Sequence, residues 1–320
     1  MELFQTTLGQ LIYLIILIAL GYLLMKLSLI PADTNTALSK LENLVFLPAL
    51  MLSTFMNNFT AEKLSSLYKI LLSSVILEII IIPIAILIAR LTYKTDYLRK
   101  IATYGLCFSN FGFMGNAVMQ ALFPDIFLEY SVFTLPLWIF IMLWGVPTLL
   151  MTDEGDGKRL TLGERLKPLI NPMLIAMLIG MLIGLTGLSL PTPISSAIDV
   201  LGSMMSPVAM LLTGMTLAKS ELLSLFGKWR VYILSALRLF VIPIAFMLLF
   251  SLIPENPFFT STTATLAVAS LAMPLGLNTI VIPTAYGKDT TDASSMALIS
   301  HLLSLISIPV VFALLNILVK

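Results

Sequence analysis

The segment CFSNFGFMGNAVMQALFP, residues 107–124, lies inside a hydrophobic run that is long enough to cross a lipid bilayer. Its centre nevertheless carries glycines and polar side chains, namely Ser109, Asn110, Gly112, Gly115, Asn116 and Gln120. Glycine weakens a helix, and amide side chains are costly to place in hydrocarbon. Irregular backbone at membrane depth is tolerated only where it is buried in protein or lines an aqueous cavity. The segment therefore predicts an interrupted transmembrane helix.

The composition of the whole chain is that of a polytopic membrane protein. Of its 320 residues, 58% are hydrophobic and 11% are charged, and the mean hydropathy is +1.02. A soluble domain is nearer half apolar and a quarter charged. The net charge of +1 argues against a nucleic-acid partner. The single cysteine, Cys107, excludes an intrachain disulfide.

Ten hydrophobic segments are each long enough to span the hydrocarbon core, which takes about 20 residues. They are residues 8–29, 34–56, 66–91, 101–123, 130–151, 171–190, 193–217, 229–253, 262–286 and 293–319. A hydrophilic linker, residues 152–170, lies between the fifth and the sixth. The chain thus divides into residues 1–151 and 171–320, with five predicted helices in each half.

The distribution of basic residues predicts the orientation in the membrane, because Lys and Arg accumulate in cytoplasmic loops. Of the 18 Lys and Arg residues, 14 lie on the side of the odd-numbered loops. Only Lys63, Lys69 and Lys320 lie on the other side, and Arg238 falls inside the eighth segment. We therefore expect the linker to be cytoplasmic, both termini to lie outside, and the protein to reside in the plasma membrane.

An internal repeat relates the two halves of the chain. IIPIAIL at 81–87 returns as VIPIAFM at 241–247, an offset of about 160 residues, and LSLIP at 27–31 returns as LSLP at 188–191. Two further proline matches have nearly the same offset: Pro48 with Pro207, and Pro147 with Pro309. Because five is odd, the second half enters the membrane from the opposite face. This predicts an inverted-topology repeat, in which the substrate site lies near the midplane between the halves.

The repeat predicts a counterpart for the opening segment. It is MPLGLNTIVIPTAYG, residues 273–287, in the ninth predicted helix. We expect non-helical backbone near 112–116 and 274–278, where the fourth and ninth helices cross. Half-helix N-termini would suit an anion there, and half-helix C-termini a cation or proton donor. The candidate substrate-binding residues are Asn110, Gly112, Gly115, Asn116, Gln120, Pro274, Asn278 and Thr279.

Titratable residues inside the predicted helices are a second group of candidates. Glu78 and Arg238 are separated by the repeat offset, so they occupy equivalent positions in the two halves. Three interpretations remain open: an ion pair that holds the halves together, a fixed charge or proton-sensitive switch at a coupling-ion position, and an Arg238 clamp for a substrate carboxylate. His301 is either a polar partner or a proton carrier. No metal-ligand cluster and no catalytic constellation is evident, so we expect neither a metal cofactor nor an enzyme.

Four stretches together resemble the auxin efflux carrier family. They are GYLLMKLSLIP (21–31), VFLPALML (45–52), SNFGFMGNAVMQALFP (109–124) and MPLGLNTIVIPTAYG (273–287). The likeness, to a bacterial member, covers essentially the whole chain. One departure is that Asn116 and Ala117 follow Gly115, where the family usually has a proline shortly after the glycine.

The resemblance implies an all-α protein of ten transmembrane helices in two inverted repeats, with broken, crossed fourth and ninth helices. Helices 1, 2, 6 and 7 would form a scaffold that makes a homodimer, and helices 3–5 and 8–10 a moving transport domain. The function implied is secondary transport of a small organic anion, auxin-like or malate- or malonate-like, by an elevator-type mechanism. Coupling to H⁺ or Na⁺ remains open. The alternatives are a sodium-coupled symporter of the related bile-acid type and a non-transporting receptor or channel.

Overall fold

The computed structural model describes residues 2–151, 163, 170–219, 226–285 and 287–318. Most of the predicted cytoplasmic linker, residues 152–170, therefore lies outside the described residues, as does Lys320. The described residues are mostly helical and contain no strand; an isolated bridge pairs Ser109 with Leu275. The prediction of an all-helical protein is confirmed.

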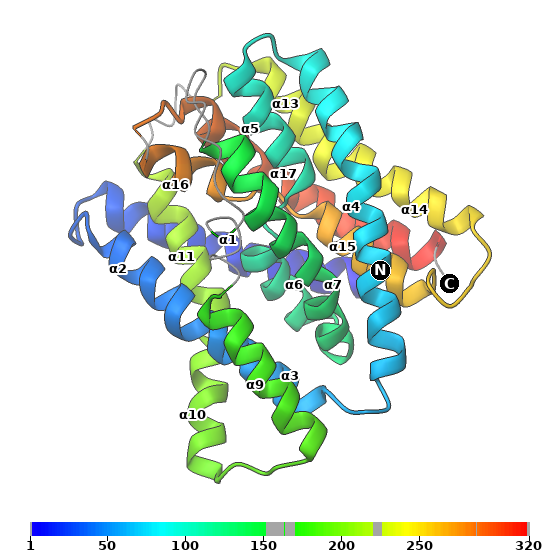
Figure 1. Ribbon diagram of the computed structural model, residues 1–320. Coiled ribbons are helices and arrows are strands. Elements are labelled where there is room, and N and C mark those ends of the chain that lie inside the picture. The colour runs from blue at the N-terminus through cyan, green and yellow to red at the C-terminus, as the bar shows by residue number, and fades with distance from the viewer. Residues whose placement is uncertain (1, 152–162, 164–169, 220–225, 286, 319–320) are drawn as a thin grey trace.

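The first half of the chain contains the helices labelled α1 to α7 in Figure 1, with π-helical and 3₁₀-helical segments between several of them. Its elements are α1 (Glu2–Lys26), α2 (Thr34–Leu41), η1 (Glu42–Phe46), α3 (Leu47–Asn58), α4 (Leu64–Thr92), α5 (Asp96–Cys107), η2 (Phe111–Gly115), α6 (Asn116–Leu122), η3 (Pro124–Ile126), α7 (Phe127–Phe140) and η4 (Ile141–Leu150).

The second half contains α9 (Pro172–Thr186), α10 (Thr192–Ser203), α11 (Met205–Leu217), α13 (Trp229–Ala236), η6 (Leu237–Val241), α14 (Ile242–Leu252), α15 (Ser261–Ala272), α16 (Asn278–Ala285) and α17 (Thr291–Leu318). Within the described ranges, six helical stretches are long and apolar enough to cross a membrane, and α9 and α15 are shorter apolar helices. The chain is therefore a polytopic membrane protein by the length and composition of its helices.

Prolines explain most of the irregular helical turns. The π-helical turns η1 and η6 end just before Pro48 and Pro243, and Pro147 lies within π-helical η4. Proline has no N–H and its ring displaces the carbonyl four residues earlier, so the preceding turn widens. Arg238 lies in one of these widened turns.

Glycines allow unusually close packing between α1 and α11 and between α3 and α9. A Cβ on Gly21 would strike the carbonyl of Leu211 on α11, and one on Gly180 would lie 2.8 Å from the carbonyl oxygen of Leu52 on α3. Gly184 likewise meets the α3 backbone, one helical turn after Gly180. Small residues four apart let transmembrane helices approach this closely. Helix α10 completes this group by packing on α3.

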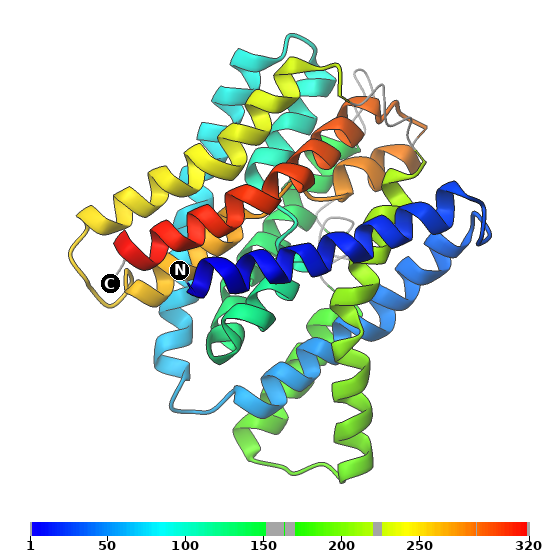
Figure 2. The same ribbon diagram turned by 180° about the vertical axis from the view of Figure 1, so that it is seen from behind.

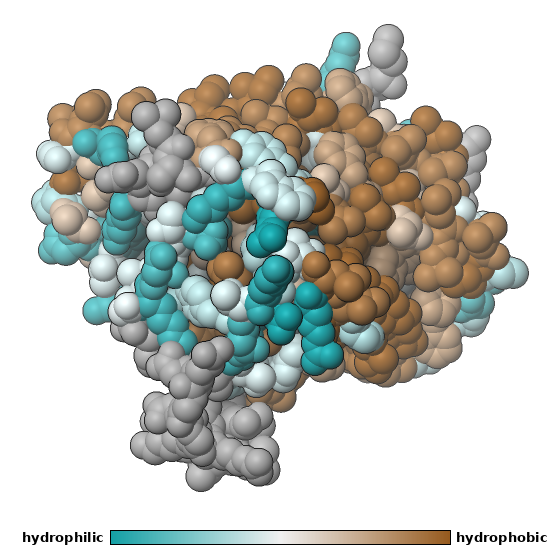
Figure 3. All heavy atoms as spheres, turned by 90° about the horizontal axis from the view of Figure 1, so that it is seen from above, coloured by the Kyte–Doolittle hydropathy of each residue, from teal (hydrophilic) through white to brown (hydrophobic). Residues whose placement is uncertain are grey.

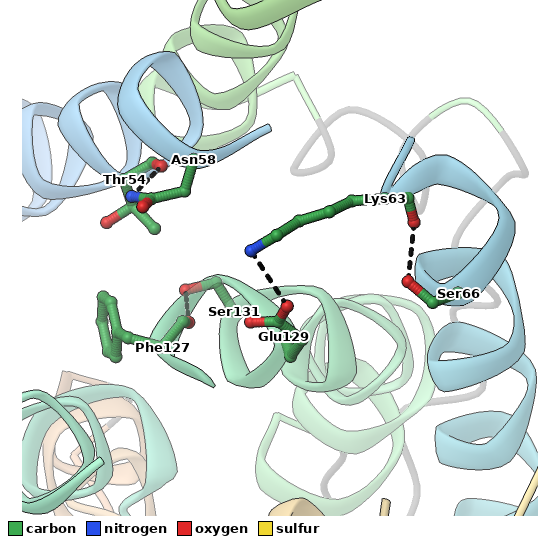
Figure 4. Close-up of polar contacts among 7 residues, drawn as sticks. All are labelled: Thr54, Asn58, Lys63, Ser66, Phe127, Glu129 and Ser131. Carbon is green, nitrogen blue, oxygen red and sulfur yellow. Dashed lines mark hydrogen bonds and ion pairs between the residues drawn. The ribbon is translucent and has the colours of Figure 1, made fainter. Parts of the chain in front are cut away.

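Helix α2 packs on η1 and α11 and so belongs with this group, while the other helices form a second group, in which α4 packs on α5 and α7, and α17 packs on α13 and α15. Helix α1 lies across the boundary, in contact with both α11 and α17 (Figure 2). The α3–α4 connection is tied to the second group by an ion pair in which Lys63 Nζ lies 3.2 Å from Glu129 Oε1 on α7 (Figure 4). Hydrophobic side chains cover much of the outer surface beside a hydrophilic patch (Figure 3).

Candidate functional site

Two helix interruptions lie against each other in the middle of the second helix group. The break between α5 and η2 spans residues 108–110, and the break between α15 and α16 spans residues 273–277. The backbone N–H of Asn110 donates to the carbonyl of Pro274 at 2.7 Å, and Ser109 pairs with Leu275 in an antiparallel bridge. The two non-helical segments thus supply hydrogen-bond partners for each other's backbone groups, and lipid hydrocarbon offers no such partners.

The first interruption lies four residues earlier in the chain than the position predicted from Gly112 and Gly115. The structure keeps 112–116 helical, in η2 and at the start of α6, and places the break at 108–110. The glycines instead make room for aromatic side chains. A Cβ on Gly112 would lie 2.6 Å from the Trp138 ring, and one on Gly115 would strike the Tyr130 hydroxyl. Tyr130 in turn donates to the Phe111 carbonyl at 3.1 Å.

Arg238 satisfies the carbonyls at the C-terminal ends of both half-helices. Its side chain is 2% exposed. Nη1 donates to Leu106 O of α5 at 2.5 Å, Nη2 to Ser270 O at 3.3 Å, and Nε to Met273 O at 3.4 Å. The last carbonyls of a helix lack intrahelical partners and carry partial negative charge. A buried guanidinium is therefore well suited to join the two ends.

Glu78 does not form the direct ion pair with Arg238 that the repeat suggested. The two groups interact electrostatically, but no ion pair within 4.0 Å joins them, and neither carboxylate oxygen of Glu78 has a hydrogen-bond partner in the described part of the chain. The physical reason is that the guanidinium of Arg238 is directed at the half-helix carbonyls.

His301, a residue of α17, hydrogen-bonds to the first interruption. Its Nδ1 lies 2.7 Å from Ala297 O, which can only accept, so Nδ1 carries the hydrogen. The other nitrogen, Nε2, then accepts from Asn110 Nδ2 at 3.2 Å. The neighbouring Ser300 hydroxyl accepts from the Leu275 N–H at 3.0 Å. Adjacent residues of α17 therefore brace both interruptions, and the geometry gives His301 the hydrogen-bond pattern of a neutral imidazole.

A small cavity, the crossing cavity, opens between the two interruptions. Its volume is about 20 Å³, roughly enough for one water molecule. The lining comes from the N-terminal ends of the second half-helices and from an aromatic wall: Ser109, Asn110, Phe111, Gly112, Phe113, Gly276, Leu277, Asn278, Tyr104, Trp138 and Ile141. No acidic or basic side chain is among them. The starts of two helical segments thus line one space, together with Asn278.

The structure divides the predicted substrate-binding residues into two sets. Asn110, Gly112 and Asn278 line the crossing cavity, and Pro274 and Thr279 support it: the Pro274 carbonyl accepts from Asn110, and the Thr279 hydroxyl donates to Gly276 O at 2.8 Å.

The other set lies away from the cavity lining. Gly115 packs on Tyr130. Gln120 accepts from the Ser206 hydroxyl of α11 at 3.4 Å, and Asn116, one turn earlier on α6, lies on the same face. Gln120 therefore belongs to the contact between α6 and α11.

Two contributors were not predicted from the sequence. The hydroxyl of Tyr104 accepts from Asn278 Nδ2 at 3.0 Å, and Trp138 packs edge-on against Phe111 with ring centroids 5.2 Å apart. Tyr104 lies in the last turn of α5, one turn before the break. A polar aromatic residue so close to an interrupted segment is the signal that could have identified it.

Long apolar helices and two interrupted helices that meet at one small cavity are typical of a polytopic membrane transporter. The sequence profile described as "Membrane transport protein" matches residues 6–164 and 159–312. The chain therefore belongs to the membrane transport protein family, the family of the auxin efflux carriers that its motifs resemble. A comparison with curated proteins found no match. The family is one of transporters and not of enzymes.

Proposed function

We propose that this protein is a secondary transporter of a small organic anion, and that the anion binds at the crossing cavity. The observation that carries the proposal is that two helix starts, at 110–113 and 276–278, line one cavity. The N-terminus of a helix offers unpaired N–H groups and partial positive charge. A carboxylate is matched by such donors, whereas a cation would meet no carboxylate in the lining.

The size of the cavity supports a mechanism with more than one conformation. At about 20 Å³, the crossing cavity has no room for a carboxylate together with its carbon chain. Binding therefore requires the lining to move. The aromatic residues Tyr104 and Trp138 are the side chains that would have to move, because they line the cavity and contact the two helix starts, Tyr104 at Asn278 and Trp138 at Gly112.

The packing of the helices supports an elevator-type cycle. Helices α1, α3, α9, α10 and α11 are locked together by glycine contacts with the neighbouring backbone, which suits a static scaffold. The crossing lies entirely in the other group, held by Arg238, Ser300 and His301. We therefore propose that this group moves as a unit against the scaffold. We also retain the expectations from the sequence, namely the ten-helix inverted repeat, the scaffold homodimer, the plasma-membrane location and the external termini.

The test is ligand binding by the purified protein, measured as a thermal shift and then by calorimetry. Ligands that bind only the folded protein raise its apparent stability. Monocarboxylates, dicarboxylates, their amides and matched amines are each tested with and without sodium and at two pH values. We expect carboxylates to stabilise the protein and amides and amines to have little effect.

The matched variants are Asn278→Ala at the cavity and Asn57→Ala on α3. Asn278→Ala removes a donor for the anion, so affinity should fall about 5- to 30-fold, equivalent to ~1–2 kcal/mol. Asn57, whose amide donates to the Ser53 hydroxyl at 3.3 Å, is remote from the cavity and its loss should leave affinity unchanged. Uptake of a cation into proteoliposomes, with carboxylates failing to compete, would overturn the proposal.

A further inference from the structure

A second and larger cavity lies outside the crossing, at the end of the molecule where α4 meets α5. Its volume is about 480 Å³ and it shares no lining residue with the crossing cavity. The last turns of α4 and the first turns of α5 supply the basic residues, and η4 supplies one wall. Its lining includes Arg90, Arg99, Lys100, Asp96, Thr103 and Trp144. We call it the basic cavity.

The charges of the basic cavity are unbalanced. Lys100 pairs with the single lining acid, Asp96, with Nζ 2.6 Å from Oδ2. Arg99 uses only Nε, which donates to the Tyr93 carbonyl at 2.8 Å. Its two terminal nitrogens and the whole guanidinium of Arg90 have no bonded partner in the described ranges. Two guanidinium groups are thus free to bind an anion, and the planar fork of arginine matches phosphate oxygens in pairs.

The surroundings of the basic cavity are those of a lipid-facing site at the membrane surface. Arg90 is in the last turn of α4. Leu87 and Leu91, which lie on either side of Arg90 in the sequence of α4, are 59% and 79% exposed, so bare apolar side chains lie next to this cation on the helix. The same end of the molecule carries a hydrophilic patch bordered by hydrophobic surface (Figure 3).

We propose that the basic cavity binds the phosphate of an anionic glycerophospholipid. The headgroup phosphate lies between Arg90 and Arg99, and the acyl chains lie along the exposed leucines of α4. Basic pockets between transmembrane helices on the positively charged face of a membrane protein are suited to such headgroups. A free phosphate ester has the same phosphate group but has no acyl chains to contact the apolar surface beside the cavity.

The experiment compares lipids on the full-length protein in a neutral detergent. Phosphatidylglycerol, phosphatidylcholine, glycerol phosphate and inorganic phosphate are titrated, with thermal shift and native mass spectrometry as readouts. We expect phosphatidylglycerol to be retained and to raise the melting temperature, and the other three to do neither. Equal effects of the two lipids would overturn the proposal. Equal protection by glycerol phosphate would also overturn it, by showing a site for a free solute.

Variants test whether the cavity is responsible. The double change Arg90→Gln with Arg99→Gln should weaken phosphatidylglycerol binding at least tenfold. The control is Arg230→Gln, because Arg230 lies over the Trp229 ring at 5.5 Å and does not line the cavity. If the control weakens binding as much, general surface charge is responsible and the proposal fails.

Two further results keep the proposal testable. Should the double Gln variant fail to fold, the Arg90→Lys, Arg99→Lys variant retains the charge without the fork and should weaken binding about threefold. Competition between carboxylate ligands and phosphatidylglycerol would show that the cavity is instead an entrance for the transported anion.

Discussion

Replacing Arg238 by methionine tests whether this guanidinium holds the two half-helices together. Methionine preserves much of the side-chain volume and removes every donor. The bond to Leu106 O is short, at 2.5 Å, and those to Ser270 O and Met273 O are longer, at 3.3 and 3.4 Å. Taking about 2 kcal/mol for the short charged bond and about 1 kcal/mol for each long one, the free energy of unfolding should fall by about 4 kcal/mol.

Variants of Glu78 show how much of the stability loss in Arg238→Met comes from the lost hydrogen bonds to carbonyls and how much from the lost electrostatic interaction with Glu78. Glu78→Gln alone should cost about 1 kcal/mol or less, because the carboxylate has no hydrogen-bond partner among the described residues. In the double variant, neutralising Glu78 removes an uncompensated buried charge, so about 1 kcal/mol of the Arg238→Met loss should be recovered. Arg238→Lys keeps a charged donor but loses the planar fork, so it should lower the free energy of unfolding by about half as much as Arg238→Met.

The assay is an SDS titration of the protein in mixed micelles, followed by fluorescence. Trp138 and Trp144 report on the crossing, because they pack on Phe111 and Phe108 with ring centroids 5.2 and 6.2 Å apart. Arg230→Met is the control and should change the free energy of unfolding by at most about 1 kcal/mol, because it removes only the contact of Arg230 with the Trp229 ring. A loss below about 1 kcal/mol in Arg238→Met, or full recovery in the double variant, would refute the assignment of Arg238 to the half-helix carbonyls.

Three other outcomes are expected. Gly115→Ala should lower stability by about 1–3 kcal/mol, because the added methyl strikes the Tyr130 hydroxyl, whereas Gly9→Ala, with open space around it, should be neutral in a thermal melt. His301→Gln should leave the pH profile of uptake unchanged, since an amide oxygen can accept the hydrogen bond that the imidazole accepts; a flattened profile would instead make His301 a proton carrier. Lys63→Met, which breaks the half-exposed ion pair of Figure 4, should cost at most about 1 kcal/mol in the same SDS titration.

The positions of the helices could be predicted from local sequence because hydrophobic runs and prolines act locally. The eighth segment, expected at 229–253, is continuous helical structure from Trp229 to Leu252. The interrupted ninth helix was likewise expected from Pro274, which removes a backbone donor inside an apolar run. In the fourth helix the glycines at 112 and 115 indicated a break, but its position was wrong by four residues.

That error shows what tertiary structure alone decides. Sequence reveals that a glycine lacks a side chain but not what occupies the vacated space, which here is Trp138 and Tyr130 from α7. It likewise reveals that Arg238 is a charge inside an apolar run but not which acceptors lie within reach of its guanidinium. The membrane class and the helix positions follow from local hydrophobicity, which each segment carries by itself. The partners of buried polar groups depend on which distant segments pack together, and only the folded chain brings Leu106, Met273 and Arg238 to one place.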